Sequence, residues 1–589
     1  MKTLTALFLV FVQVMLVSFM TTSSSALTWS AEVQLDSFSA GSVAGSSLRI
    51  AAAPNGNIMA VWVQNDGKND NIYSNLCVGG KWGTATLVES STMPATEPRV
   101  TADANGNFIA VWRQAWNVVN GTNYGIYASR YVAGQGWGKT DTVFVDSKRT
   151  DISANGAVEV AMDPKGNAIA VWTVYDWSWN HTSVRSNRYV VGTGWSGVTN
   201  LSTEDVQMAF SPQVALDSTG NAMVVWRQDG GAGNKSAQGV HADYYTYGSG
   251  WGKPTLIESS ANTKDRSGDG IRVAFDPAGN AIAAWYQYSK PGIFANRFVP
   301  GKGWETPQSI ADPGKTSYDD GVNLALDKDG NAIATWNQSG GVLYANRFVS
   351  GSGWGTTVVV NPNGSDYSSQ VAFYQNGSAL AIWGQYACNS YNIMSSQYSA
   401  GTGWSAVSQC YDKSPSYINK TLDYTREPQL VIDSKGTATA VWIRGYGGYG
   451  SIFSSTAVAD SQSSGGTTTI TGSSGFDVSV TKSGTSKSLS LTAVLQADPK
   501  DVGKSENIYF ILYYLDNLWF MNSSGDLVFF DGRSTPSLSN GKLASQTTLI
   551  SFSGLNLSSL NGLSFIAGYG TSINEMIDNS RFKFFYTVQ

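Results

Sequence analysis

The stretch that decides the fold is D-P-K-G-N-A-I-A-V-W at residues 163–172, because close variants of it recur seven more times along the chain. The eight copies end at Trp62, Trp112, Trp172, Trp226, Trp285, Trp336, Trp383 and Trp442. Consecutive copies lie 47 to 60 residues apart, a spacing typical of a unit of four strands. The repeat therefore predicts an all-β protein built from eight similar antiparallel sheets.

Residues 273–310 show the order of strands within one unit. A strand (VAFD) enters the turn D-P-A-G-N, a second (AIAAWYQY) leaves it, a third (GIFANRFV) returns, and a fourth follows G-K-G-W. The fourth strand begins at Trp82, Trp137, Trp195, Trp251, Trp304, Trp354 and Trp404, which is seven copies for eight units. Short antiparallel units repeated in this way indicate the blades of a β-propeller.

The missing fourth strand lies at the other end of the chain. Residues 27–37 (LTWSAEVQLDS) match the fourth-strand pattern, whereas the last unit stops after its third strand, at residues 451–455. Pairing the two would remove two exposed sheet edges at once. The sequence thus predicts an eight-bladed β-propeller closed by the N-terminal strand.

The rest of the chain divides by composition. Residues 1–26 carry an apolar run and a small-residue site, which indicate a secretory signal peptide, so we expect a secreted, extracellular or cell-surface protein without membrane insertion after cleavage. The propeller is predicted over 27–458, and a Ser/Gly/Thr linker over 459–475. Residues 476–589 predict a small C-terminal β-sandwich-like domain from eight short strand patterns.

Composition and motifs exclude several functions. Charged residues are 14% of the chain and its net charge is −5, so the basic surface expected of a nucleic-acid-binding protein is missing. The familiar hydrolase, metalloprotease and phosphate-loop motifs are absent. Three cysteines and two histidines favour no metal and no cofactor. We expect the turn aspartates to accept backbone N–H groups and shape the hairpins.

One polar residue precedes the first core position of each innermost strand. The eight are Arg49, Arg99, Glu159, Gln213, Arg272, Asn323, Gln370 and Gln429. We expect them to surround a central channel, where the three arginines could clamp a carboxylate such as that of a sialic or uronic acid. A solvated channel wall is the alternative interpretation.

A second candidate site is aromatic. Trp116, Trp177 and Trp179 lie outside the repeat, in predicted loops that also carry Tyr124, Tyr175 and His181. Aromatic rings beside polar side chains suit sugars, whose apolar faces stack. Alternatively, these loops fold over the propeller and bury their rings. Both the D-x-x-G-N and G-x-G-W turns fall at one end of the blades, so the variable loops at the other end are the expected binding face.

The cysteines and the second histidine receive structural predictions. Cys388 and Cys410 fall in one blade and are predicted to form a disulfide. Cys77 replaces a Tyr or Phe of other third strands and is expected to be a buried free thiol. His241 occupies a similar third-strand place and is expected to pack between blades.

The repeats resemble exported bacterial proteins with D-x-x-G-N-A-x-A-V-W repeats and the third-strand phrase I-Y-A-N-R-Y. That phrase occurs here as IYASR (126–130), FANRF (294–298) and YANRF (344–348). The unit is more loosely similar to propeller lectins such as the fungal fucose-binding family. D-V-G-K (501–504), G-Y-G (568–570) and the terminal R-F-K-F-F-Y-T-V look similar to a small domain of exported bacterial repeat proteins. The resemblance implies an extracellular location and brings no catalytic residue.

These patterns favour a secreted or cell-surface binding or adhesion protein, carbohydrate-binding through the variable-loop face, with a glycan or a surface protein as its partner. The C-terminal domain could mediate assembly. One alternative is a structural subunit of an extracellular assembly. Another is a sialidase-like or other glycoside-active enzyme, with carboxylates drawn from Asp265, Asp269, Asp319 and Asp320.

Overall fold

The structure is a computed structural model and divides into two compact units, with the boundary near residue 461. It describes residues 27, 29–36, 43, 48–89, 91–117, 123–146, 152–178, 180–202, 206–230, 239–258, 269–287, 291–311, 321–338, 340–364, 366–387, 390–405, 407, 425–445, 450–458, 477–485, 488–514, 517–524, 526–529, 536–555, 563–572, 575–576 and 581–587. The predicted signal peptide and the predicted linker both lie outside the described residues. Among the described residues, no helix is long and apolar enough to cross a membrane.

The described part of the first unit contains eight antiparallel sheets of four or five strands, numbered here in chain order. Sheets 1 and 2 contain β2 (Arg49–Ala52), β3 (Ile58–Asn65), β4 (Asp70–Val78), β5 (Lys81–Trp82) and β6 (Thr86–Leu87), then β7 (Ala95–Ala102), β8 (Phe108–Asn117), β9 (Asn123–Val132), β10 (Gly136–Trp137) and β11 (Asp141–Phe144). Sheets 3 and 4 contain β12 (Ile152–Met162), β13 (Ala168–Asp176), β14 (His181–Val190) and β15 (Gly194–Asn200), then β16 (Val206–Leu216), β17 (Ala222–Gly230), β18 (Gly239–Thr246), β19 (Gly250–Trp251) and β20 (Thr255–Leu256).

The remaining four sheets follow the same order of strands. Sheets 5 and 6 contain β21 (Asp269–Phe275), β22 (Ala281–Gln287), β23 (Gly292–Val299), β24 (Gly303–Trp304) and β25 (Gln308–Ser309), then β26 (Val322–Leu326), β27 (Ala332–Gln338), β28 (Val342–Val349), β29 (Gly353–Trp354) and β30 (Val358–Asn361). Sheets 7 and 8 contain β31 (Asp366–Phe373), β32 (Ala379–Ala387), β33 (Ser390–Ser399) and β34 (Gly403–Trp404), then β35 (Thr425–Ile432), β36 (Thr437–Arg444), β37 (Ser451–Val458) and β1 (Val33–Gln34).

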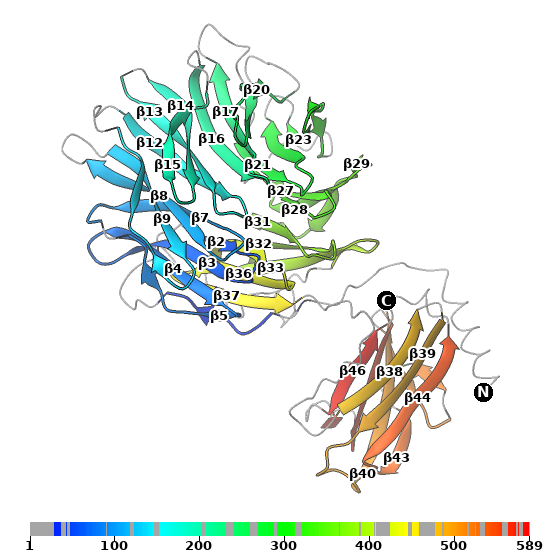
Figure 1. The fold of residues 1–589 in the computed structure, drawn as a ribbon. Coiled ribbons are helices and arrows are strands. Elements are labelled where there is room, and N and C mark those ends of the chain that lie inside the picture. The colour runs from blue at the N-terminus through cyan, green and yellow to red at the C-terminus, as the bar shows by residue number, and fades with distance from the viewer. Residues whose placement is uncertain are drawn as a thin grey trace. The chain divides into compact units, whose positions relative to one another are not determined.

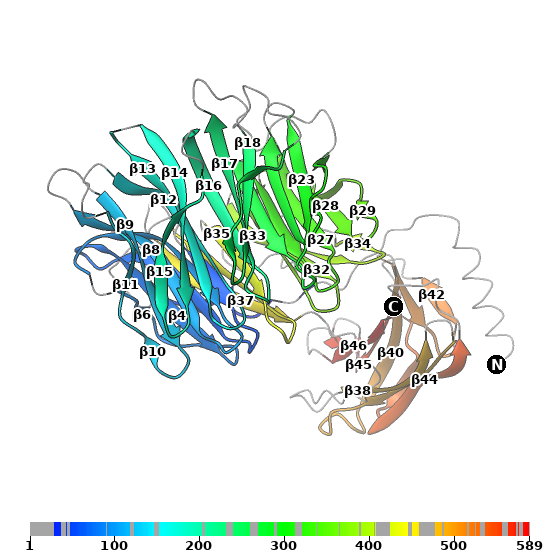
Figure 2. The same cartoon turned by 45° about the horizontal axis from the view of Figure 1, so that its top comes forward.

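The sheets follow one another around a common centre, which is the arrangement of a β-propeller (Figures 1 and 2). The first strand of each sheet contacts the first strand of the next, through β2, β7, β12, β16, β21, β26, β31 and β35, and β35 contacts β2 again. The innermost strands therefore surround one central space. The prediction of an all-β protein is confirmed.

The D-x-x-G-N turn is held by its own aspartate. Asp163 Oδ1 accepts the backbone N–H of Lys165 and of Asn167, both at 2.9 Å, while Oδ2 accepts the Asn167 side-chain amide at 2.8 Å. Asn167 Oδ1 in turn accepts the N–H of Val191, in the turn between β14 and β15. Asp103, Asp217, Asp276, Asp327 and Asp433 bond in the same way to the backbone N–H four residues on. The hairpin role predicted for these aspartates is confirmed.

The repeat tryptophans form the cores between sheets. All eight closing tryptophans, from Trp62 to Trp442, are at most 1% exposed. The fourth-strand tryptophans are half-buried, and six of them lie against a third-strand ring, as Trp137 does edge-on against Tyr131 at 5.6 Å. Trp82 lies opposite Cys77 instead. His241 is buried and stacks on Trp226, as predicted. Cys77 is buried and free, also as predicted.

A polar position on the third strand connects neighbouring strands and sheets. In every sheet it pairs with the residue two before the closing tryptophan, and its occupants are Asn75, Ser129, Asn187, Asp243, Asn296, Asn346, Ser396 and Ser455. We call it the third-strand polar position. Seven occupants are Asn or Ser, and each donates its side-chain N–H or O–H to a backbone carbonyl at 2.8–3.1 Å. Asp243 of sheet 4 is the exception, because a carboxylate has no proton to donate.

The N-terminal segment lies against sheet 8. β1 pairs with β37, and Trp29, 3% exposed, forms a bridge with Ala457. Ser455 donates to the carbonyl of Ser30 at 2.8 Å, just as Ser129 donates to that of Gly138 after Trp137. On the other side, Asn75 of sheet 1 donates to the carbonyl of Leu35 at 2.8 Å.

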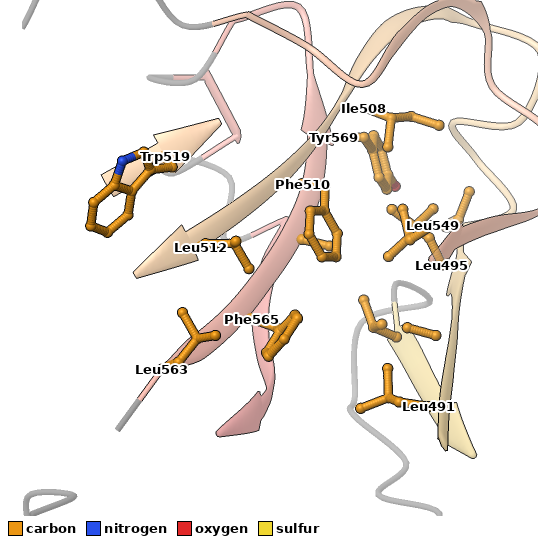
Figure 3. Packing of buried hydrophobic residues seen from close by; sticks show 14 of the residues in the cluster. Leu491, Leu495, Ile508, Phe510, Leu512, Trp519, Leu549, Leu563, Phe565 and Tyr569 are labelled. Atoms are coloured by element: carbon orange, nitrogen blue, oxygen red, sulfur yellow. The ribbon is translucent and has the colours of Figure 1, made fainter. Parts of the chain in front are cut away.

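The second unit contains two sheets over one apolar core. One contains β38 (Asp477–Thr485), β39 (Ser488–Gln496) and β44 (Gln546–Leu555); the other contains β40 (Ser505–Tyr514), β41 (Asn517–Met521), β42 (Leu527–Phe529), β43 (Ser539–Lys542), β45 (Ser564–Gly570) and β46 (Phe582–Thr587). Figure 3 shows Leu491, Leu495 and Leu549 of the first sheet facing Phe510 and Phe565 of the second. Eight of these strands coincide with predicted ones. The short β43 was not predicted, because S-N-G-K has no apolar alternation.

The motifs noted in the C-terminal sequence meet in one buried network. Asp501 is fully buried and accepts bonds from Lys504 Nζ at 2.7 Å and from the Tyr569 hydroxyl at 2.9 Å. The Arg581 guanidinium lies 3.3 Å away and also pairs with Glu575 at 2.8 Å. Burial alone would raise the pKa of Asp501, but these partners outweigh it and lower the pKa below its ordinary value. The network joins three segments that are distant in the sequence.

Candidate functional site

The eight polar residues that precede the innermost core positions all line one central cavity of about 580 Å³. They are Arg49, Arg99, Glu159, Gln213, Arg272, Asn323, Gln370 and Gln429. The structure thus brings together the three arginines that the sequence singled out. Each innermost strand contributes one of these residues, since the strands follow one another around the centre.

A backbone irregularity presents these side chains to the cavity. In six sheets the pairing between the first two strands shifts register just before the lining residue, as between Thr96 and Arg99. Four shifts contain a non-glycine residue with positive φ: Glu97 at 55°, Ser211 at 50°, Ser368 at 50° and Glu427 at 53°. Such a conformation costs roughly 1–2 kcal/mol per residue, and bulges of this kind commonly re-aim side chains beside functional sites.

Proline marks three of these bulges. Pro98, Pro212 and Pro428 each follow a positive-φ residue and precede a lining residue. Because proline has no N–H, it fits a position where ladder pairing is broken. The repeated Glu-Pro or Ser-Pro before Arg or Gln is the sequence signal that could have predicted the bulges.

Five of the eight lining side chains curl back onto their own strands, whereas Asn323 donates to the carbonyl of Ser369 on the next innermost strand. Arg49 and Arg272 donate through Nη1 to the carbonyl of the preceding residue, at 2.7 and 2.8 Å. Arg99, Gln213 and Gln429 do the same at 3.1 Å. This bond fixes the side chain, and each guanidinium keeps further N–H groups, since it has five in all.

Positive charge dominates the cavity. Its charged lining residues are three arginines and Glu159, which pairs with Arg99 Nε at 2.9 Å. Burial, together with repulsion from Arg99, lowers the pKa of Arg49 to about 10. Burial also lowers the pKa of Arg272; attraction to Glu159 partly opposes this effect, and a smaller repulsion from Arg99 adds to it. An anion in the cavity would relieve this crowding of like charge.

The predicted aromatic site lies apart from the cavity. Tyr175, Trp177 and His181 belong to the β13–β14 hairpin of sheet 3, and none of them lines the cavity. Trp177 is 63% exposed and packs edge-on against the Tyr175 ring at 4.5 Å. The Tyr175 hydroxyl donates to Asn180 Oδ1 at 2.6 Å. Trp177 therefore presents much of its ring to solvent, while Trp179 lies outside the described residues.

Several residues expected in loops lie in strands. Trp116 and Tyr124 belong to β8 and β9, which extend through a register shift between Ala115 and Asn117. His181 begins β14 and pairs with Asp176. Trp116 is half-buried, and the Arg113 guanidinium lies 4.4 Å from the Tyr124 ring, so these rings take part in packing.

Most of the other predicted site residues lie outside the part of the chain that the structure describes. Cys388 and Cys410 lie outside the described residues, so their disulfide stays a prediction. Asp265, Asp319 and Asp320 also lie outside them, whereas Asp269 begins β21. A second cavity, between sheets 4 and 5, was not predicted from the sequence.

Fold and cavity together define a β-propeller-type protein with a positively charged central cavity. No protein-family model and no curated protein matches the chain. A protein of unknown function from Dyadobacter fermentans is 11% identical with a TM-score of 0.37, covering 74% of this chain and 100% of that one. The six-bladed lectin of Aleuria aurantia, described with a fucose recognition mode, is 14% identical with a TM-score of 0.30, covering 54% and 97%. A fungal alcohol oxidase with copper is 9% identical with a TM-score of 0.38, covering 96% and 100%.

Proposed function

We propose that this chain is a carbohydrate-binding protein that holds a carboxylated sugar, such as a sialic or uronic acid, in its central cavity. The proposal rests on the charges of the cavity lining, which contains three arginines and a single carboxylate, that of Glu159. Guanidinium groups match carboxylates in charge and geometry, and the amides of Gln213, Gln370 and Gln429 suit sugar hydroxyls.

The proposal includes the finer architecture. The eight sheets act as eight blades, and residues 27–37 supply the closing strand of the last one. Its support is that Ser455 and Asn75 bond to Ser30 and Leu35 as their equivalents bond in other sheets. A closed ring keeps the arginines at fixed separations, which favours a preorganised site.

The proposal also covers location and domain roles. Residues 1–26 act as a signal peptide, and the mature protein works outside the cell as a binding or adhesion protein. Residues 476–589 form a separate domain that attaches the propeller to a surface or to another subunit. The division of the chain near residue 461 supports this boundary.

Binding without catalysis fits the cavity better than glycoside cleavage. Cleavage commonly uses two carboxyl groups, one acting as acid and one as base or nucleophile. Within the described residues the cavity offers only Glu159, and Arg99 already pairs with it. A structural subunit that binds other proteins is the second candidate, favoured by the exposed Trp177.

A glycan array tests the proposed function. The mature protein should bind glycans that carry sialic or uronic acids in preference to neutral ones. Arg272→Gln should remove that preference, and it suits the fold because Gln213, Gln370 and Gln429 occupy equivalent positions. Arg130→Gln makes the same charge change outside the cavity and should bind normally. Binding confined to neutral glycans, or none at all, would refute the proposal.

A further inference from the structure

The second cavity, of about 620 Å³, lies between sheets 4 and 5. Sheet 4 contributes residues of β18, β19 and β20, and sheet 5 contributes residues of β23 and β24. It shares no lining residue with the central cavity. This cavity is therefore a candidate site independent of the proposed sugar site.

Asp243, the exception at the third-strand polar position, lines this cavity. It is 3% exposed. Its Oδ1 has no hydrogen-bond partner of good geometry, and the same holds for the amide Oδ1 of Asn75, Asn296 and Asn346 at the equivalent position. The backbone N–H groups of Tyr244 and Gly252 face the Asp243 carboxylate and partly oppose the rise in its pKa that burial causes. The neighbouring backbone N–H, that of Gly252, donates instead to the carbonyl of Tyr244 at 3.0 Å. Among the described residues, no side-chain donor and no cation bonds to this buried carboxylate, which is unfavourable in a folded protein.

The other charges around Asp243 do not neutralise it. Glu258 also lines the cavity and is buried, which adds a second carboxylate. Glu305 lines it as well and pairs with Arg297 at 3.2 Å, so that guanidinium is already engaged. Lys253 is the one cation among the lining residues, and it is exposed.

Aromatic rings complete the wall. Trp251 and Trp304 line the cavity together with Tyr244 and Phe298, whose ring centroids lie 4.8 Å apart. Carboxylates beside aromatic rings are the groups that bind organic cations, through ion pairing and cation–π attraction.

The repeat shows that the third-strand polar position accepts uncharged residues in the other sheets. At the same position, seven sheets use Asn or Ser to donate a hydrogen bond that the carboxylate cannot make. Residues that are less favourable for stability than their equivalents in the other repeats are typical of functional sites.

We propose that the cavity between sheets 4 and 5 binds a small organic cation, such as a quaternary ammonium or guanidinium compound, with Asp243 as its charge partner. The cation supplies the positive charge that Asp243 lacks in the protein itself. Trp251 and Trp304 contact its apolar groups.

Ligand-observed NMR on the full mature chain tests this inference with choline and its uncharged isostere 3,3-dimethylbutan-1-ol. Choline should bind at least tenfold more tightly than the alcohol, and methylguanidinium should do the same against N-methylurea. In Asp243→Asn, which installs the residue that the repeat uses elsewhere, the preference for both cations should be lost. A melting temperature no lower than that of the wild type would show that the variant is folded.

Arg272→Gln separates this site from the proposed sugar site. It should leave choline binding unchanged, because Arg272 lines only the central cavity. If neither cation binds the wild type more tightly than its neutral isostere, or if Asp243→Asn retains the preference, the inference is overturned. Failure of acidic-sugar binding alone would affect only the proposed function.

Discussion

Asp243→Asn should make the first unit more stable, although Asp243 is buried and native. The substitution gives sheet 4 the residue that four other sheets carry at the third-strand polar position. Asparagine is uncharged and has an amide N–H, so it removes a buried charge and can donate to a carbonyl as Asn296 does to that of Ile257, at 2.9 Å.

The size of the expected gain in stability follows from the raised pKa of Asp243. Burial raises the pKa of Asp243 to about 6, from an ordinary value of 3.8. That difference corresponds to about 3 kcal/mol of lost stability at neutral pH, which residual solvent screening reduces to about 2 kcal/mol. Spread over a unit of about 430 residues, a gain of this size raises the melting temperature by about 2 °C.

The pH dependence has a definite sign. Because the pKa is raised in the folded state, the stability linked to Asp243 is fully present below its unfolded pKa. It is lost as the pH rises from about 4 through about 6. The variant should therefore match the wild type near pH 4 and be more stable than it at pH 7.5.

Differential scanning calorimetry of the full mature chain at both pH values measures this difference without added cations. Asn296→Asp is the matched control, because it places a carboxylate at the same position in sheet 5 and removes the hydrogen bond to the carbonyl of Ile257. It should lower stability by at least about 2 kcal/mol at pH 7.5. If Asp243→Asn is less stable than the wild type at pH 7.5, or if its gain is the same at pH 4, the reasoning is wrong.

Two further perturbations test other parts of the structure. Trp29→Ala should destabilise the first unit by about 3–5 kcal/mol, because Trp29 is buried against sheet 8; an unchanged transition in calorimetry would contradict the closing role of residues 27–37. Asp501→Asn should destabilise the second unit by about 3–5 kcal/mol at pH 7, because it disrupts the bonds from Lys504, Tyr569 and Arg581. Since the pKa of Asp501 is lowered by folding, that loss should shrink as the pH falls through the folded pKa, and a loss independent of pH would count against the network.

The regular part of the fold was predictable because it repeats. Each D-x-x-G-N turn has the same local hydrogen bonds, and each closing tryptophan lies in the same kind of core, so eight copies reinforced one interpretation. The lining residues of the central cavity were predictable for the same reason, since Arg49 and Gln429 hold equivalent positions on different strands.

The features that could not be predicted from the sequence depend on contacts between distant segments. Trp116 was expected in a loop, but a bulge lets β8 continue through it. The cavity at Asp243 depends on how sheet 5 packs beside sheet 4, which no local pattern encodes. A signal was nonetheless present, because V-H-A-D-Y-Y replaces the Asn or Ser of the other third strands with Asp.

The most direct test of the proposed sugar site is a pair of calorimetric titrations of the mature protein at pH 7.5, with D-galacturonate and with D-galactose. Charge-assisted hydrogen bonds from Arg49, Arg99 and Arg272 predict that galacturonate binds more tightly, by roughly 10- to 100-fold. Arg272→Gln should weaken galacturonate binding and leave galactose unchanged. Equal affinity for the two sugars, or galacturonate binding that survives Arg272→Gln undiminished, would contradict the account.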